Sequence, residues 1–83
     1  MNAAIACLED TILRLVEEAK QASEMAIACS GASSEAVAFN ISRSETLTQV
    51  LHTWSNQLQT FGLESQLNGV WADLRDFLRS QGY

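Results

Sequence analysis

Proline is absent from this sequence, and basic residues are scarce, with one lysine (Lys20) and four arginines in 83 residues. A chain without proline is more typical of helical hairpins than of loop-rich folds, which use proline in their turns. Nucleic acids and anionic membrane surfaces both bind clustered Lys and Arg side chains. With 10 acidic residues against 5 basic ones and a formal charge of −5, we expect neither nucleic-acid binding nor membrane binding.

Long apolar runs and a cysteine framework are lacking too. No stretch approaches the ~20 apolar residues of a membrane span, and no basic region precedes the first apolar stretch, so we expect no secretory leader. Cys7 and Cys29 stand 22 residues apart, which on one helix is roughly 33 Å and too far for a disulfide. We therefore expect reduced thiols, buried as small apolar side chains, in a cytoplasmic protein.

Apolar and small residues recur at alternating steps of three and four over residues 2–29, the period of a helix with one buried face. This seam comprises Ile5, Leu8, Ile12, Leu15, Ala19, Ala22, Ala26 and Cys29. Its first half is bulky and its second half is small, which allows a neighbouring helix to come close. The polar side carries charges at helical spacing, and they predict the ion pairs Asp10–Arg14, Arg14–Glu18 and Lys20–Glu24.

A serine-rich break separates this helix from a second one, predicted over 35–61. Gly31 suits the C-cap of the first helix, and a serine at 33–34 suits the N-cap of the second. Ser42 and Glu45 fit a capping box, so a fresh helix could begin there. We favour one helix through this stretch, with an irregularity at the serines as the alternative.

A third helix is predicted over 64–80, after Gly62 ends the second. Gly69 inside it costs roughly 1 kcal/mol relative to alanine. Either this glycine permits a close helix crossing, or Asn68 is the real N-cap. The sequence therefore predicts an all-α protein, a single domain over 1–83, built as a small helical bundle from a long helical hairpin plus a shorter third helix.

Reactive groups are few and isolated. His52, the only histidine, has no nucleophile or orienting carboxylate in a recognisable motif. The segment GLESQL (62–67) resembles the Gly-Leu-Asp-Ser-Leu site of acyl carrier proteins, which would imply a phosphopantetheine arm on Ser65. It departs from that site, since Glu64 replaces the aspartate and Gln66 follows the serine. We expect no enzyme, no metal and no cofactor; a carrier-type or catalytic domain using Ser65 or His52 is the alternative function.

We expect instead a protein-binding protein that occupies a surface of another protein, as regulators, secretion chaperones and phage-encoded inhibitors do. Only 18% of residues are charged, against roughly 25% in an average domain, and short chains leave much apolar surface uncovered. Both facts favour a covered face and a homodimer. Self-association is expected at Ile5, Leu8, Ile12 and Leu15. Partner contacts are expected at an acidic stripe and along the amphipathic last helix, namely at Glu17, Glu18, Glu24, Trp71, Leu74 and Leu78.

Overall fold

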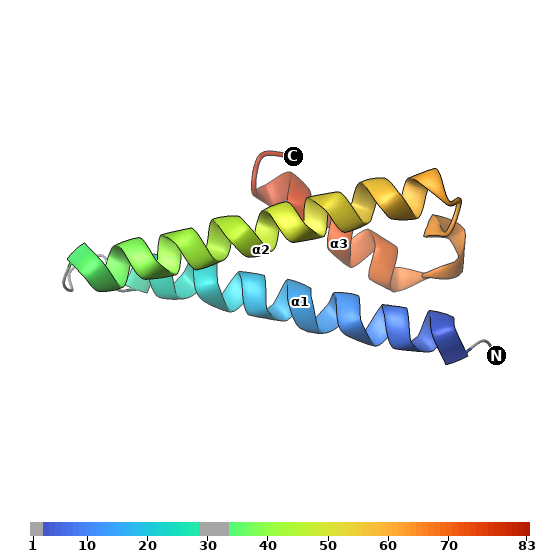
Figure 1. Ribbon diagram of the computed structural model, residues 1–83, viewed down its shortest axis with the longest axis horizontal. Helices are drawn as coiled ribbons and strands as arrows, with labels where there is room; N and C mark the ends of the chain where they lie inside the picture. Colours follow the sequence, from blue (N-terminus) through green and yellow to red (C-terminus); the bar gives the residue numbers. More distant parts are fainter. Residues whose placement is uncertain (1–2, 29–33) are drawn as a thin grey trace.

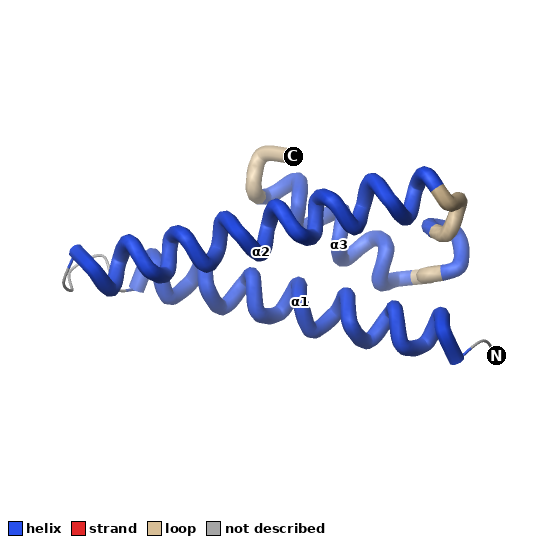
Figure 2. The backbone as a smooth tube through the Cα atoms, in the orientation of Figure 1, coloured by secondary structure: helices blue, strands red, loops and turns tan. Residues whose placement is uncertain are grey.

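Two long antiparallel helices form a hairpin, and a short third helix packs across one side of it, as Figure 1 shows for the computed structural model. The structure describes residues 3–28 and 34–83. The elements are α1 (Ala3–Ala28), α2 (Ser34–Thr60), the 3₁₀ turn η1 (Glu64–Gln66) and α3 (Gly69–Ser80). All regular structure in these residues is helical, as the tube in Figure 2 makes plain, so the predicted all-α class is confirmed.

The two long helices begin and end within one residue of the predicted bounds, 2–29 and 35–61. The caps predicted at Gly31 and Ser33, and the thiol of Cys29, lie outside the described residues.

Helix α2 is continuous through its serine-rich stretch, which confirms the prediction of a single helix and shows that Ser42 and Glu45 do not form a capping box. Polar side chains here bond to their own helix. The Asn40 side-chain amide donates to the carbonyl of Ala36 at 3.0 Å, and the Thr48 hydroxyl donates to the carbonyl of Ser44 at 2.8 Å. Because these groups are satisfied locally, the helix buries them without breaking.

The predicted third helix is divided by a tight turn. The N–H of Val70 donates to the carbonyl of Leu67 at 3.0 Å, which places Asn68 and Gly69 at the centre of the turn. Asn68 has φ +50° and ψ −130°, the conformation of the first central residue of a type II′ turn. A helix cannot run through that conformation. The alternative start of α3 at Asn68 is therefore confirmed, although its side chain makes no capping hydrogen bond.

Helices α2 and α3 end on glycines. Gly62, with φ +68°, donates its N–H to the carbonyl of Gln59 at 3.0 Å, and Leu63 donates to the carbonyl of Leu58 at 2.9 Å. These two bonds form a Schellman motif, which turns the chain sharply and satisfies carbonyls at the helix end. Gly82 repeats the arrangement after α3. The predicted end at Gly62 is confirmed.

The apolar core lies where α3 meets the hairpin. Its large, fully buried side chains are Ile12, Leu51, Leu67, Leu74 and Leu78. Each contributes about 1.5–3 kcal/mol of transfer free energy. Further along the hairpin, toward the end of α1 and the start of α2, the buried residues are small or polar: Ala19, Ala22, Asn40 and Ser44. The hairpin therefore has two unlike halves.

Helix α3 covers only one side of the hairpin. It reaches the side of α2 that carries Ser55, whose hydroxyl oxygen accepts a hydrogen bond from Nη1 of Arg75 at 3.0 Å. The chain end follows the same side, where the rings of Tyr83 and His52 lie 4.4 Å apart between centroids. In the view of Figure 1, α3 lies behind the hairpin, and no described element covers the front. The molecule is accordingly a slab of 47 × 22 × 15 Å.

Candidate protein-binding surface

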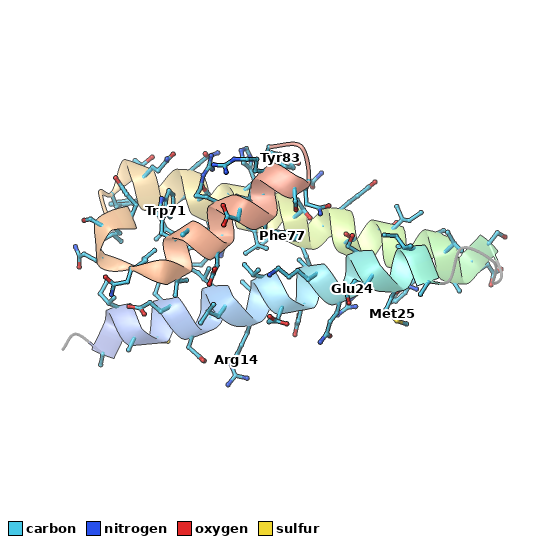
Figure 3. The ribbon with its side chains drawn as sticks, turned by 180° about the vertical axis from the view of Figure 1, so that it is seen from behind. Arg14, Glu24, Met25, Trp71, Phe77 and Tyr83 are labelled. Atoms are coloured by element: carbon cyan, nitrogen blue, oxygen red, sulfur yellow. The ribbon has the colours of Figure 1, made fainter. Side chains whose placement is uncertain are left out.

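The last helix offers less surface than predicted. Leu74 and Leu78 are 0% exposed, because they fill the core between α3 and the hairpin. Trp71 is half-buried and packs at the edge of that core, with the guanidinium carbon of Arg75 5.9 Å from its ring centroid; Figure 3 shows it from the α3 side. In this fold Leu74 and Leu78 present no surface to a partner, and partner contact along this helix stays a prediction. The apolar stripe that suggested this contact attaches α3 to its own chain.

The seam predicted for self-association is likewise used within one chain. Ile12 is completely buried, and Ile5, Leu8 and Leu15 pack half-buried against the same core. A helix seam of alternating three and four steps serves an intramolecular or an intermolecular partner equally well. Here the seam packs against α2 of the same chain. Ile12 therefore cannot contact another molecule while the chain stays folded.

The three glutamates predicted to form an acidic stripe are exposed, and one of them lies apart from the other two. Glu18 lines a groove between α1 and α2. Glu24 lies in a groove on the α3 side, together with Asp73 and Asp76. Glu17 and Glu18 also line a second groove together, on the outer side of α1. Glu24 therefore faces the α3 side, whereas Glu17 and Glu18 lie together; partner contact at these residues stays a prediction.

A row of apolar side chains follows α2 on the side away from α3. From α2 it comprises Phe39, Leu47, Val50, Trp54 and Phe61. Phe39 is 68% exposed and Phe61 73% exposed, large fractions for phenylalanine, while Leu47 and Trp54 are half-buried. Val50 and Trp54 line a shallow groove that is almost wholly apolar. We call this surface, together with the facing side of α1, the hairpin face.

Two opposite charges lie in the middle of the hairpin face. Glu18 of α1 and Arg43 of α2 line the same groove, with Phe39 and Leu47 beside them. Within residues 3–28 and 34–83 neither side chain forms an ion pair. Met25 stands two helical turns from Glu18 and so lies on the same side of α1; it is 49% exposed. This groove of the face therefore combines exposed apolar side chains with one charge of each sign.

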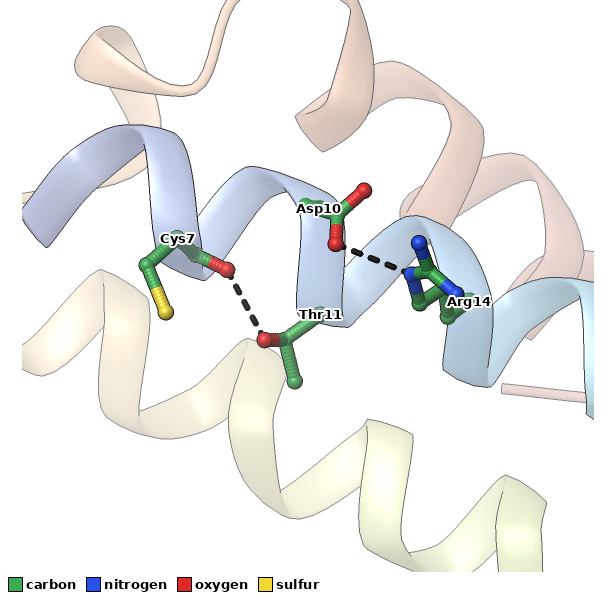
Figure 4. Close-up of polar contacts among 4 residues, drawn as sticks. All are labelled: Cys7, Asp10, Thr11 and Arg14. Atoms are coloured by element: carbon green, nitrogen blue, oxygen red, sulfur yellow. Dashed lines mark hydrogen bonds and ion pairs between the residues drawn. The ribbon is translucent and has the colours of Figure 1, made fainter. Parts of the chain in front are cut away.

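Residue Cys7 is exposed, which corrects the expectation of a buried thiol. Figure 4 shows its surroundings on α1: the hydroxyl of Thr11 donates to the carbonyl of Cys7 at 2.8 Å, and Nε of Arg14 donates to Oδ2 of Asp10 at 2.9 Å. The predicted Asp10–Arg14 ion pair is confirmed. The other two predicted pairs, Arg14–Glu18 and Lys20–Glu24, are not formed in the described part of the chain.

The residues of the alternative function lie apart from each other. His52 is half-buried on α2, with its ring tilted by 37° against the ring of Tyr83. Ser65 is exposed in η1, one residue after the half-buried Glu64. Across residues 3–28 and 34–83, no group of His, Cys, Asp and Glu side chains is arranged to hold a metal ion.

The residue that the sequence reasoning missed is Phe39. A signal for it exists: Phe39, Arg43, Leu47, Val50, Trp54 and Phe61 follow one another at steps of three, four and seven, which is a second stripe on α2. An inward stripe, which carries Leu51 and Leu58, runs beside it on the same helix. Separating the two would have revealed that α2 is apolar on more than one side.

In comparisons with known proteins, no family model, no curated protein and no solved structure matches the chain. Among the described residues, none of the helices has the length and apolar character needed to cross a membrane.

Proposed function

We propose that this chain is a protein-binding protein that acts by occupying a surface of another protein, as a regulator, inhibitor or chaperone-like adaptor. The binding surface is the hairpin face. The observation that carries the proposal is the row of exposed and half-buried apolar side chains from Phe39 to Phe61, on the side of the hairpin that α3 leaves open. Contiguous apolar patches on small proteins mark interaction sites.

The chemistry of the face favours a protein as the partner. Aromatic side chains such as Phe39 and Trp54 are the usual anchors of protein interfaces. A single arginine, Arg43, lies among them, which is too little positive charge for a phosphate backbone. The overall charge of −5 points the same way. The proposal places the chain in the cytoplasm, where an exposed thiol such as Cys7 stays reduced.

Affinity purification from the native host, with matched variants, tests the proposal. Phe39→Ser removes an apolar anchor from the hairpin face. Ile27→Ser removes an equally exposed side chain, 73% exposed, from the opposite side of α1, seven residues from Lys20 in the α3 groove. We expect Phe39→Ser to lose proteins that the wild type and Ile27→Ser retain, while circular dichroism shows equal helicity. Retention of the same proteins by both variants would mean that the face is not the binding surface.

The alternative, carrier or catalytic chemistry at Ser65 or His52, is tested by intact-mass spectrometry of protein from the native host. We expect a mass that corresponds to the unmodified sequence. A phosphopantetheine adduct on Ser65 would replace the protein-binding proposal with the carrier function.

A further inference from the structure

We propose that the occupant of the hairpin face is a second copy of this chain, so that two hairpins stack face to face as a four-helix arrangement with α3 of each copy on the outside. The inference rests on the proposed function and narrows it, because the surface that the hairpin face occupies is then that of a second copy rather than that of a different protein. It differs from the seam expected from the sequence, since Ile12 and its neighbours stay inside each copy.

The shape of a single chain supports a missing layer. Its radius of gyration is 14.2 Å, whereas a compact domain of this length has about 12 Å. Its accessible surface is 5316 Å², whereas a folded monomer of 9.1 kDa exposes about 4,900 Å². The thickness of only 15 Å leaves little interior. Stacking a second slab on the open side would correct all three quantities.

The area of the hairpin face is sufficient for a stable dimer. Two helices of 26 and 27 residues lie side by side, which gives a length of about 39 Å and a width of about 20 Å. One copy would then bury about 800 Å², close to the contribution of each partner in a standard-size interface.

Charge selects the arrangement within that interface. Glu18 and Arg43 lie at the same level of the hairpin, one on each helix, across one groove. A two-fold axis parallel to the helices places α1 of one copy against α2 of the second. Each Glu18 then faces Arg43 of the second copy, and the contact occurs twice because a two-fold interface is self-complementary. A perpendicular axis would instead place α1 against α1, which lacks this match.

The same axis accounts for a second pair of exposed side chains. Met25 and Phe39 lie near the same level on opposite helices of the hairpin, since α1 and α2 are antiparallel and joined at that end. In the dimer Met25 of each copy meets Phe39 of the second, a sulphur–aromatic contact. In a single copy Met25 is 49% exposed and Phe39 is 68% exposed. The dimer would bury both side chains.

Sedimentation equilibrium of the purified wild type, run over a range of concentrations, measures the association. We expect a mass that rises toward twice 9.1 kDa. Glu18→Arg places four cations in the interface and Arg43→Glu places four anions, so each variant alone should raise the dimer dissociation constant roughly tenfold or more. An equimolar mixture of the two variants should restore association, because every position then faces its opposite charge.

Matched controls carry equal charge changes on the α3 side of α1. Lys20→Glu and Glu24→Arg, both on exposed residues in the α3 groove, should associate as the wild type does. Equal helicity by circular dichroism shows that each variant is folded. Restoration by mixing cannot arise from general destabilisation, so it is the decisive result.

Three outcomes would overturn the inference: a wild type that stays monomeric throughout, single variants that associate normally, or a mixture that does not recover. The purification experiment separates this failure from failure of the proposed function. A monomeric wild type whose Phe39→Ser variant still loses co-purified proteins would mean that another protein occupies the face. A monomeric wild type whose Phe39→Ser and Ile27→Ser variants retain the same proteins would end both proposals.

Discussion

The hairpin contains two halves that reach the same helical geometry by different means. In the half that contains the start of α1 and the end of α2, which we call the apolar half, the two helices are separated by large side chains such as Ile12 and Leu51. In the other, small-residue half, the buried positions are Ala19, Ala22, Asn40 and Ser44. Four large apolar residues of this second half are exposed: Met25, Ile27, Phe39 and Ile41.

The difference teaches that helical continuity and core formation are separable. The small-residue half buries little apolar area, so its helices gain little transfer free energy of their own. Because each long helix is continuous with a packed part in the apolar half, the small-residue half needs no helix nucleus of its own, and propagation of a helix is far easier than nucleation. The small-residue half therefore contributes exposed surface, which includes the side chains of Phe39 and Met25.

Truncation of the apolar core should produce the largest effect. We expect Leu74→Ala to lower the free energy of unfolding by about 2–5 kcal/mol, because it leaves a cavity where a fully buried leucine stood. Urea denaturation followed by circular dichroism measures it. Ala72→Gly on the exposed side of α3 controls for helix propensity and should cost only about 1 kcal/mol. A loss below 1 kcal/mol for Leu74→Ala would argue that α3 does not share the hairpin core.

Hydrogen exchange should separate the two halves directly. In the Arg43→Glu variant, which we expect to be monomeric, amides of residues 37–44 should exchange about 100-fold faster than those of residues 51–58, since local opening follows buried apolar contact. In the wild type, which we propose to be a dimer, the difference in exchange rate between the two segments should narrow. Uniform protection along α2 in the monomer would remove the distinction between the halves.

Overpacking should test the close approach of the helices in the small-residue half. We expect Ala22→Leu to cost about 1–3 kcal/mol, because a fully buried alanine against α2 leaves no room for three further carbons. Ala38→Leu, at an exposed position of α2, should change stability by less than about 0.5 kcal/mol. An Ala22→Leu variant as stable as the wild type would mean that this half is not tightly packed.

The turn before α3 should yield the smallest effect, and a stabilising one. Asn68 holds φ +50° and ψ −130°, which glycine adopts without the clash that a Cβ brings. We expect Asn68→Gly to raise the free energy of unfolding by roughly 0.5–1 kcal/mol, partly offset by the freer unfolded chain. Asn68→Ala should lower it by a similar amount. Equal stability of the two variants would contradict the turn geometry.

Much of the fold follows from periodicity. The seam of α1 and the inward stripe of α2 predict both helices to within a residue, because packing on one face repeats every 3.6 residues. The start of α3 could be predicted only as one of two alternatives. The sequence was compatible with a helix that runs through Gly69 and equally with a helix that starts at Asn68.

The candidate surface was harder to predict. A stripe such as Trp71–Leu74–Leu78 has the same pattern whether it meets its own chain or another, and only the position of α3 decides. The exposure of Phe39 was missed because its stripe on α2 overlaps the inward stripe. Leu47 and Trp54, which are half-buried, belong to both stripes. Which side of a hairpin a third helix covers depends on contacts between residues distant in sequence.

The two tryptophans lie on opposite sides of the slab. Trp54 lines the apolar groove of the hairpin face, and Trp71 packs beneath Arg75 on the α3 side. The chain therefore carries one built-in fluorophore per surface. In a Trp71→Phe variant, the emission maximum of Trp54 reports whether the hairpin face is exposed to water or covered. In a Trp54→Phe variant, quenching of Trp71 fluorescence reports detachment of α3. Neither measurement needs an external dye.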